Sequence, residues 1–266
     1  MMSWYHLLGL LMDILCIPDA HAHPEAGNER FDILGKFIIE RRPSVILCIG
    51  DLFSMDSLSS FDKGKRSFEG RRYTKDIEVG IDAQRRMFAP TIEHNKLKSD
   101  KKKYKPRKVF TLGNHEHRIE RATQEAPELE GAIGYKDLKL EEFGWEVYPF
   151  RDVVNIEGVN FSHYFSSGVM DRAISGNNIG KSLLNIKKAT VVQGHSHLLS
   201  IATEVTVNND RIWGISAGCY LDHYEPYTSK SIQETFWRGV LMLSDVHNGD
   251  FDLELISLDR LKKYYA

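Results

Sequence analysis

Side chains that can bind metal ions gather at five places in this chain, and each place ends or lies within a short apolar run that predicts a β-strand. The side chains are carboxylates, an amide and imidazoles, with no cysteine among them. Such mixed ligands suit Mn²⁺, Fe, Zn²⁺, Co²⁺ or Ni²⁺, whereas Ca²⁺ prefers oxygen ligands. The five clusters are Asp19-x-His21, Gly50-Asp51, Gly113-Asn114-His115-Glu116, His163 and Gly194-His195-x-His197.

The spacing within two clusters favours a site for two ions. An Asp-x-His pair on an extended segment points both side chains to the same side, because side chains alternate along a strand. Asp19 and His21 have this spacing, and so do His195 and His197. Two such pairs and a carboxylate able to bridge describe a site where ions about 3.5–4 Å apart hold an oxyanion while a bound hydroxide attacks. Each cluster alone is common in structural roles, so the combination carries the prediction.

Apolar periodicity predicts the elements that position these clusters. Residues 14–17 and 45–49 are expected to be buried strands, with a helix between them that Pro43 ends. Asp19 and Asp51 would then lie at strand ends, where ligand-binding groups of open α/β sheets gather. A longer helix is expected near residues 75–94 and a short one near 137–143. The last third of the chain is β-rich, with Asn248-Gly249 as a tight turn.

The composition is that of a globular protein with a sizeable core. The chain has 266 residues, 42% hydrophobic and 27% charged, and its net charge of −2 gives no global attraction to nucleic acid or membrane. We expect one domain over residues 12–266, preceded by an apolar extension, residues 1–11, that packs on the surface or mediates a contact. The extension has neither a basic start nor a cleavage site, so we expect no signal peptide, no membrane span, and a cytoplasmic protein with reduced cysteines.

Two segments concentrate positive charge. Residues 61–75 contain six Lys or Arg interleaved with three aromatic residues, a pattern that could hold phosphates while a ring stacks on a base. Residues 96–108 contain eight basic residues in thirteen and are expected to form a solvated, mobile loop, with a phosphate-tracking surface as the alternative. We interpret residues 54–108 as a lid-like basic insertion. The expected substrate contacts are His23, Lys65, Arg66, Arg71, Arg72, His117 and Arg118.

The order D-x-H, G-D, G-N-H-E, H, G-H-x-H resembles the calcineurin-like metallophosphoesterases, from residue 14 to about residue 219. The motifs I-P-D-A-H-A-H-P, G-N-H-E-H-R-I and Q-G-H-S-H-L, with the loop S-L-S-S-F-D-K-G-K-R-S-F-E-G-R-R-Y, look similar to metallophosphoesterases encoded by tailed phages. The resemblance implies an α/β fold of two packed mixed β-sheets, a β-sandwich flanked by helices in four layers. It also implies the cytoplasm of a host cell as the location if the chain is phage-encoded.

The resemblance also implies a role for each residue. Asp51 would bridge the two ions, His115 would contact the phosphate and assist the leaving group, and Glu116 would orient His115. Many relatives carry a second carboxylate shortly after Gly-Asp, which Leu52-Phe53-Ser54 lacks. By the same resemblance, one ion would be held by Asp19, His21 and His197, and the other by Asn114, His163 and His195.

The resulting expectation is a metal-dependent phosphodiesterase, with Mn²⁺ as the leading metal and DNA, RNA or a nucleotide as substrate. One alternative is a phosphomonoesterase or protein phosphatase, in which Arg118 grips a terminal phosphate. A more remote one is a non-catalytic scaffold that binds a partner through its N-terminal extension. Asp245-Val246-His247 repeats the Asp-x-His spacing but precedes a hairpin turn, so we expect no metal there, and His223 could border the cleft. The oligomeric state does not follow from the sequence.

Overall fold

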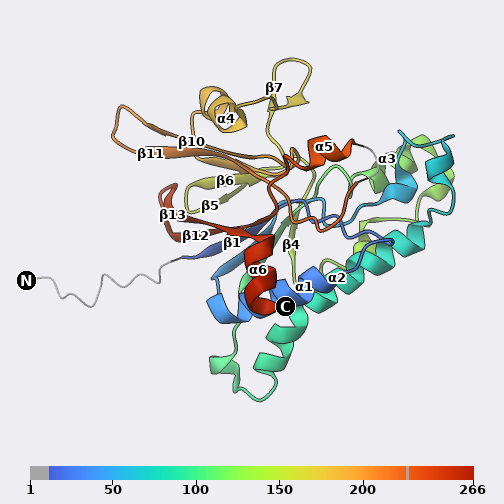
Figure 1. Cartoon of the computed structure of the whole chain (residues 1–266), viewed down its shortest axis with the longest axis horizontal. Coiled ribbons are helices and arrows are strands. Elements are labelled where there is room, and N and C mark those ends of the chain that lie inside the picture. Colours follow the sequence, from blue (N-terminus) through green and yellow to red (C-terminus); the bar gives the residue numbers. More distant parts are fainter. Residues whose placement is uncertain (1–11, 226–227) are drawn as a thin grey trace, which may run out of the picture.

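Two mixed β-sheets packed face to face form the centre of the computed structural model (Figure 1), which describes residues 12–225 and 228–266. The predicted extension, residues 1–11, lies outside the described residues. The six-stranded sheet has the order β13-β12-β1-β2-β3-β4, from β1 (Ile14–Ile17), β2 (Val45–Cys48), β3 (Arg107–Thr111), β4 (Glu146–Tyr148), β12 (Gly239–His247) and β13 (Asp250–Ser257). The five-stranded sheet has the order β10-β11-β9-β6-β5, from β5 (Val154–Ile156), β6 (Val159–Ser162), β9 (Val191–Gln193), β10 (Leu199–Val205) and β11 (Arg211–Ala217).

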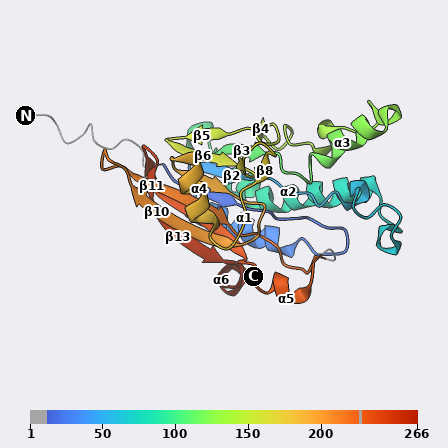
Figure 2. The ribbon, with the colours of Figure 1, turned by 90° about the horizontal axis from the view of Figure 1, so that it is seen from above.

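Helices cover the outer faces of both sheets (Figures 1 and 2). Three of them, α1 (Glu29–Arg41), α2 (Tyr73–Asn95) and α6 (Leu258–Tyr265), pack on the six-stranded sheet, and α4 (Ile179–Lys187) packs on the other. The predicted fold class, two packed mixed sheets flanked by helices, is therefore confirmed. The remaining elements are α3 (Arg118–Glu125), α5 (Lys230–Gln233) and a small hairpin of β7 (Ser166–Ser167) and β8 (Arg172–Ala173).

Alternation along the strands divides the interior into separate apolar layers. In β1, Ile14 and Cys16 face the second sheet, whereas Leu15 and Ile17 face the helices. Both sets are almost completely buried, since strand side chains point alternately to opposite faces. This explains why the strand is apolar without interruption, as is typical of central strands covered on both sides. β1, β2, β3 and β4 are mutually parallel, so their carboxyl ends meet at one edge of the sheet.

The predicted insertion, residues 54–108, divides into parts with different places in the fold. The short turns of residues 54–72 border the cleft described below. Helix α2, by contrast, is a core helix, because Ile77, Met87 and Phe88 pack into the layer beneath the six-stranded sheet. A helix of 23 residues is about 34 Å long, so the basic run that follows it lies far from the cleft. Interpreting all of residues 54–108 as a lid was therefore wrong.

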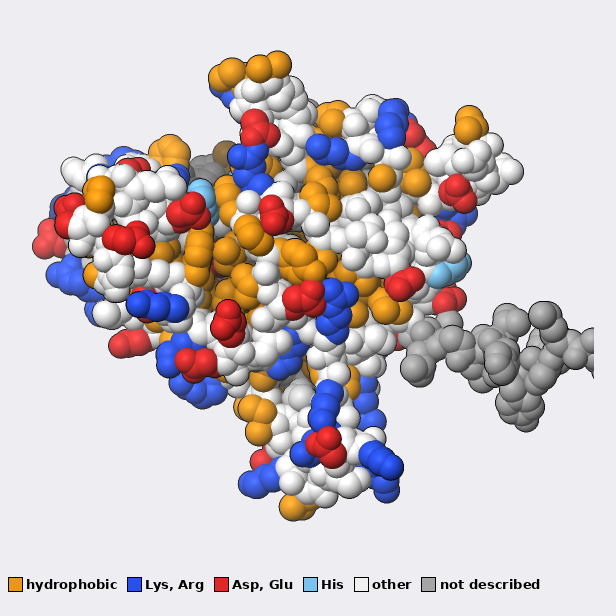
Figure 3. Space-filling model, turned by 180° about the vertical axis from the view of Figure 1, so that it is seen from behind, with side chains coloured by type: hydrophobic (Ala, Val, Ile, Leu, Met, Phe, Trp, Pro, Cys, Tyr) orange, Lys and Arg blue, Asp and Glu red, His pale blue; other side chains and the backbone are white. Residues whose placement is uncertain are grey.

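The basic run forms a protrusion at the lower end of the views in Figures 1 and 3, where Lys and Arg side chains are prominent. Lys103 and Lys105 pair with Asp100 within the run, and Arg107 begins β3.

The helix predicted near residues 137–143 is absent. A short 3₁₀ turn (Tyr135–Leu138) and further turns form this segment instead. Among the described residues, no helix is long and apolar enough to cross a membrane.

Replacing Gly80 by alanine should destabilise the protein, although alanine normally favours a helix over glycine. A Cβ on Gly80 would lie 2.0 Å from Cδ1 of Phe53, whose ring is fully buried. We expect Gly80→Ala to lower the free energy of unfolding by about 1–3 kcal/mol, as overpacking usually does. Urea denaturation measures this. Gly134→Ala, with its nearest neighbour atom at 3.8 Å, is the matched control and should change little. Equal stability of both variants would contradict the packing.

Candidate metal centre

The five polar clusters meet at one edge of the two sheets. Asp19 and His21 follow β1, Asp51 follows β2, and Asn114 and His115 follow β3. From the second sheet, His163 follows β6, and His195 and His197 follow β9. The first two loops are joined by a backbone hydrogen bond of 2.8 Å from His21 N to Asp51 O. Strands of both sheets therefore end at the same place and bring their polar loops together.

Asp51 is at the centre of this arrangement. Its Oδ2 lies 3.3 Å from Nε2 of His163, 3.8 Å from Nε2 of His21 and 3.9 Å from Nε2 of His115. Its Oδ1 accepts a 2.8 Å hydrogen bond from the backbone N–H of His115. The side chain is 3% exposed, so this carboxylate faces imidazoles on several sides with little access to water. A carboxylate so placed can be shared between two cations.

Two further convergence points flank Asp51. On one side, Oδ1 of Asn114 lies 2.9 Å from Nε2 of His163 and 2.8 Å from Nδ1 of His195. On the other side, Nε2 of His197 lies 3.5 Å from Oδ1 of Asp19. Within the described residues, three groups of side chains have donor atoms within 4.8 Å of one another: Asp19, His21 and His197; His21, Asp51 and His115; and Asp51, His163 and His195.

The backbone conformation that aims these side chains differs from the prediction. His21 has φ 42°, Asp51 φ 52°, His195 φ 67° and His197 φ 60°. These are left-handed conformations, which non-glycine residues adopt at a cost of about 1–3 kcal/mol each and which cluster at functional sites. The inference that Asp-x-His pairs align because strand side chains alternate was therefore wrong. The pairs lie in sharp turns after the strands, and the turns aim the side chains.

Glycines allow the loops to approach one another closely. A Cβ on Gly113 would lie 2.1 Å from Oδ1 of Asp51, and a Cβ on Gly194 would lie 2.1 Å from Oδ2 of Asp19. Both distances are far below van der Waals contact, so no other residue fits at either position. The carboxylates thus rest directly against the backbone of the neighbouring loop. This is the close approach that the glycines of the motifs predict.

The donor set fits divalent transition ions. His21 is 1% exposed, and neither of its ring nitrogens has a hydrogen-bond partner among the described residues. A buried polar atom without a partner costs free energy, and a cation at one nitrogen would remove that cost. His163 is prepared differently, because its Nδ1 lies 2.9 Å from the carbonyl of Ile49 and its Nε2 is directed to the site. Such a carbonyl fixes the tautomer of a ligand histidine.

Charge and burial act in opposite directions on the imidazoles. Burial disfavours the charged form of His163, but the Asp51 carboxylate outweighs burial and raises the pKa of His163 to about 9. Burial, reinforced by the neighbouring His163, lowers the pKa of His195 to about 4. Burial also lowers the pKa of His21. Neutral imidazoles are the form that binds metal ions, so His195 and His21 are already in that form at neutral pH.

The predicted contact between Glu116 and His115 is absent from the described structure. The carboxylate of Glu116 accepts hydrogen bonds from the backbone N–H groups of Asp51 (2.9 Å), Phe53 (2.9 Å) and Gly113 (2.8 Å). The ring of His115 is oriented instead by the carbonyl of Ser54, 2.6 Å from Nδ1. Glu116 therefore ties the loop after β2 to the loop after β3, and its expected role as the partner of His115 was wrong.

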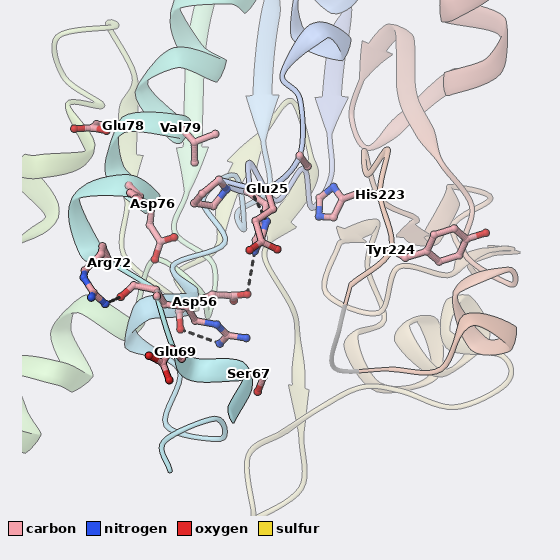
Figure 4. A pocket seen from close by; sticks show the side chains of 16 residues that line it. Glu25, Asp56, Ser67, Glu69, Arg72, Asp76, Glu78, Val79, His223 and Tyr224 are labelled. Atoms are coloured by element: carbon pink, nitrogen blue, oxygen red, sulfur yellow. Dashed lines mark hydrogen bonds and ion pairs between the residues drawn. The ribbon is translucent and has the colours of Figure 1, made fainter. Parts of the chain in front are cut away.

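A cleft of about 600 Å³ opens over the site, with Asp51, Asn114, His115, His195 and His197 in its wall. Of the predicted substrate contacts, Lys65 and Arg118 line this cleft. His23, Arg71 and Arg72 line a neighbouring groove of about 980 Å³ (Figure 4), which His223 also borders. The two hollows share Asp56 and Ser67. Arg66 and His117 line neither, and His117 stacks on Phe150 at 4.6 Å.

Asp56 is a site residue that the motif analysis missed. Its Oδ1 accepts a 2.9 Å hydrogen bond from Arg118, and its Oδ2 lies 3.5 Å from His23. In the family pattern, a second carboxylate is expected within a few residues after Asp51. Asp56 lies further along the chain and reaches the cleft because the backbone turns in a left-handed conformation at Met55. Glu225 was also missed, because no motif surrounds it. Asp245 and His247, which repeat the Asp-x-His spacing, are exposed on β12, away from the five clusters.

No family model and no curated protein matches this chain. Among solved structures, a crystal structure of TT1561 of Thermus thermophilus is similar over 93% of this chain and 99% of its own, with 10% sequence identity and a TM-score of 0.38. A second crystal structure is similar over 93% of this chain and 100% of its own, with 11% identity and a TM-score of 0.36. Likeness this distant carries no inference about function, which rests on the geometry above.

Removing the carboxylate of Glu116 should destabilise the fold itself. Glu116→Ala would leave the buried N–H groups of Asp51, Phe53 and Gly113 without their acceptor. Each such group costs about 1–3 kcal/mol, so we expect a loss of at least about 3 kcal/mol in the free energy of unfolding. Urea denaturation of the metal-free protein measures it, with the exposed Glu128→Ala as control. A loss below about 1 kcal/mol would refute the tie between the loops.

Proposed function

We propose that this chain is a metal-dependent phosphoesterase of the calcineurin-like metallophosphoesterase family, and that it hydrolyses phosphodiesters of nucleotides or nucleic acid. One observation carries the proposal: the buried Oδ2 of Asp51 lies 3.3 Å from Nε2 of His163 and 3.8 Å from Nε2 of His21, and belongs to two groups of side chains that could each hold a metal ion. The likeness to tailed-phage enzymes rests on the sequence motifs alone and stays a prediction.

Each group would hold one ion. Asp19, His21 and His197 would form the first set, Asn114, His163 and His195 the second, and Asp51 would belong to both. Two divalent ions, Mn²⁺ being the leading candidate, would supply an activated water nucleophile and positive charge for the phosphate oxygens. In the fold, Glu116 holds the two loops that carry Asp51 and Asn114 at a fixed separation. The proposed ligands would thus be arranged before an ion binds, as efficient metal sites require.

His115 would act on the leaving oxygen. Its Nδ1 lies 2.6 Å from the carbonyl of Ser54, so Nδ1 carries a proton and Nε2 is turned to the cleft. Nη2 of Arg118 lies 3.2 Å from that Nε2. When Nε2 takes up a proton, it can donate a hydrogen bond, and then the proton, to the oxygen that departs from phosphorus. Arg118 stays beside it as a cation fixed by Asp56.

The cleft wall favours a diester that carries a flat or apolar group. Phe61 is 79% exposed yet lines the cleft, where its ring could stack on a base. Lys65 lines the same cleft and is 61% exposed; its ammonium lies 3.3 Å from Oδ1 of Asp62 and could exchange this exposed pair for a second phosphate. The phosphomonoesterase alternative needs a free cation for the terminal phosphate. Arg118 is less suited to this, because it already binds the carbonyls of Ser54 and Met55 and the carboxylate of Asp56.

A hydrolysis screen tests the proposal. Purified protein is stripped of metal and supplied in turn with Mn²⁺, Zn²⁺, Co²⁺, Ni²⁺ or Fe²⁺, and bis-aryl phosphate is compared with mono-aryl phosphate. The proposal requires metal-dependent cleavage that favours the diester, and Asp51→Asn is the blank because it weakens both ion sets. Preference for the monoester would favour the phosphatase alternative. No hydrolysis and no bound metal would favour a scaffold.

His115→Ala should lose most of the turnover and keep metal binding. The ring contributes no atom to the two proposed ligand sets, so ion affinity should remain within about threefold, while loss of a general acid costs about 10²–10⁴ in rate. Steady-state kinetics and a Mn²⁺ titration of the same sample separate the two effects. His247→Ala, an exposed histidine on β12, is the control. Wild-type turnover in His115→Ala would exclude the proposed role.

Phe61→Ala should weaken the use of substrates with a base more than that of simple aryl diesters of similar size. A base–aromatic stack contributes about 1–3 kcal/mol, so kcat/KM for a dinucleotide should fall about 5- to 150-fold. Leu97→Ala, an apolar residue that is 96% exposed and follows the far end of α2, is the control. Equal kcat/KM for the dinucleotide in Phe61→Ala and wild type would rule out stacking by this ring.

A further inference from the structure

Glu225 is a buried carboxylate beneath the proposed metal centre. It is 2% exposed, and its Oε2 accepts no hydrogen bond within the described residues. Its Oε1 lies 3.0 Å from Nε2 of His223 and 3.8 Å from Nδ1 of His21. Carboxylates are seldom buried without partners, because desolvation of the charge costs several kcal/mol. The burial of the Glu225 carboxylate therefore requires a compensating interaction.

The surrounding chain holds Glu225 in place. Its backbone N–H donates to Oε1 of Gln233 at 2.6 Å, and Nε2 of Gln233 donates back to the Glu225 carbonyl at 2.6 Å. Gln233 is 1% exposed and belongs to α5, whose first turn is capped by the side chain of Ser229. The segment after β11 thus fixes the backbone of Glu225 independently of its side chain, and leaves the carboxylate directed at His21.

Comparison with the other buried imidazoles shows what His21 lacks. The ring of His163 has its Nδ1 on the carbonyl of Ile49, and the ring of His115 has its Nδ1 on the carbonyl of Ser54. In both, the contact made by one nitrogen leaves the other nitrogen directed at the site. The Nδ1 of His21 has no hydrogen-bond partner among the described residues, and its closest carboxylate oxygen is Oε1 of Glu225.

We propose that Glu225 is a positioning residue that accepts a hydrogen bond from Nδ1–H of His21 and thereby fixes Nε2 of His21 as a metal ligand. The proposal rests on the proposed metal-binding function. A small rotation of either side chain would bring the 3.8 Å separation to hydrogen-bond distance. Carboxylates behind ligand histidines fix the tautomer and raise ligand basicity, and losing one typically costs 10–100-fold in metal affinity. His223, 3.0 Å from the same oxygen, holds the carboxylate from the groove side.

Mn²⁺ titration of the metal-free protein by calorimetry tests this without any substrate. Wild type should bind two ions, and Glu225→Ala should bind one of them about 10–100-fold more weakly. Glu225→Gln keeps an acceptor oxygen of the same shape and should lose less than the alanine variant. Glu234→Ala, an exposed carboxylate that follows α5, is the matched control and should bind both ions like wild type.

A double-mutant cycle separates positioning from a general structural effect. His21→Ala removes the proposed ligand, so adding Glu225→Ala to it should cause no further loss of affinity. Wild-type affinity in both Glu225→Ala and Glu225→Gln, or full additivity with His21→Ala, overturns the proposal. If Glu225→Ala does not fold, the glutamine variant decides, because its affinity must lie measurably below that of wild type. A wild-type protein that binds no ion overturns the proposed function and this inference with it, whereas two ions bound equally by all variants overturns only this inference.

Discussion

The contact between Asp51 and the backbone of Gly113 sets the separation of the loops after β2 and β3. A Cβ at position 113 would overlap Oδ1 of Asp51 at 2.1 Å and its backbone nitrogen at 2.5 Å. Glu116 stabilises the same close approach, because its carboxylate accepts hydrogen bonds from backbone N–H groups of both loops. The proposed bridging position of Asp51, and with it the meeting of the two groups of candidate ligands, depends on this approach. The left-handed backbone at Asp51 is the conformational cost of that placement.

A second buried group, Arg30, holds the first loop. Its guanidinium donates to the carbonyls of Ala20 (2.7 Å), His21 (3.3 Å) and Gly27 (2.7 Å), and its Nε donates to the carbonyl of Tyr220 (3.1 Å). The side chain is 1% exposed, and burial lowers its pKa. Its bonds fasten the turn of Asp19 and His21 to the segment after β11, the same segment that carries Glu225. Arg30 thereby links the loop of Asp19 and His21, through backbone carbonyls, to the segment that carries Glu225.

Much of the fold follows from local patterns. The strands before Asp19 and Asp51 were predictable because they are covered on both sides and therefore apolar without interruption. The clusters were predictable because each follows such a strand. The turn conformations were not, since left-handed φ at His195 and His197 is imposed by the surrounding structure against local preference. Glu225 could not be predicted, because only its distance to His21 indicates a role. The helix α2 was predicted near its observed bounds, but its place in the core was not, because its buried face is interleaved with charged residues.

The hydrogen bonds that Glu116 accepts show the limit of transferring a role by motif position. The family resemblance implied that Glu116 orients the ring of His115, but the Glu116 carboxylate accepts its hydrogen bonds from backbone N–H groups of two loops. The neighbour that orients the ring is the carbonyl of Ser54, a backbone atom that no side-chain pattern reveals. Side-chain type therefore indicates the chemistry of this site, whereas the support beneath it is built largely from backbone atoms.

If two ions share Asp51, anomalous diffraction from crystals of the protein soaked in Mn²⁺ will locate both. We expect two peaks about 3.5–4 Å apart, one on each side of the Asp51 carboxylate. One peak lies beside Asp19, His21 and His197, and the other beside Asn114, His163 and His195. A single peak at saturating Mn²⁺, or peaks that do not touch Asp51, would contradict it.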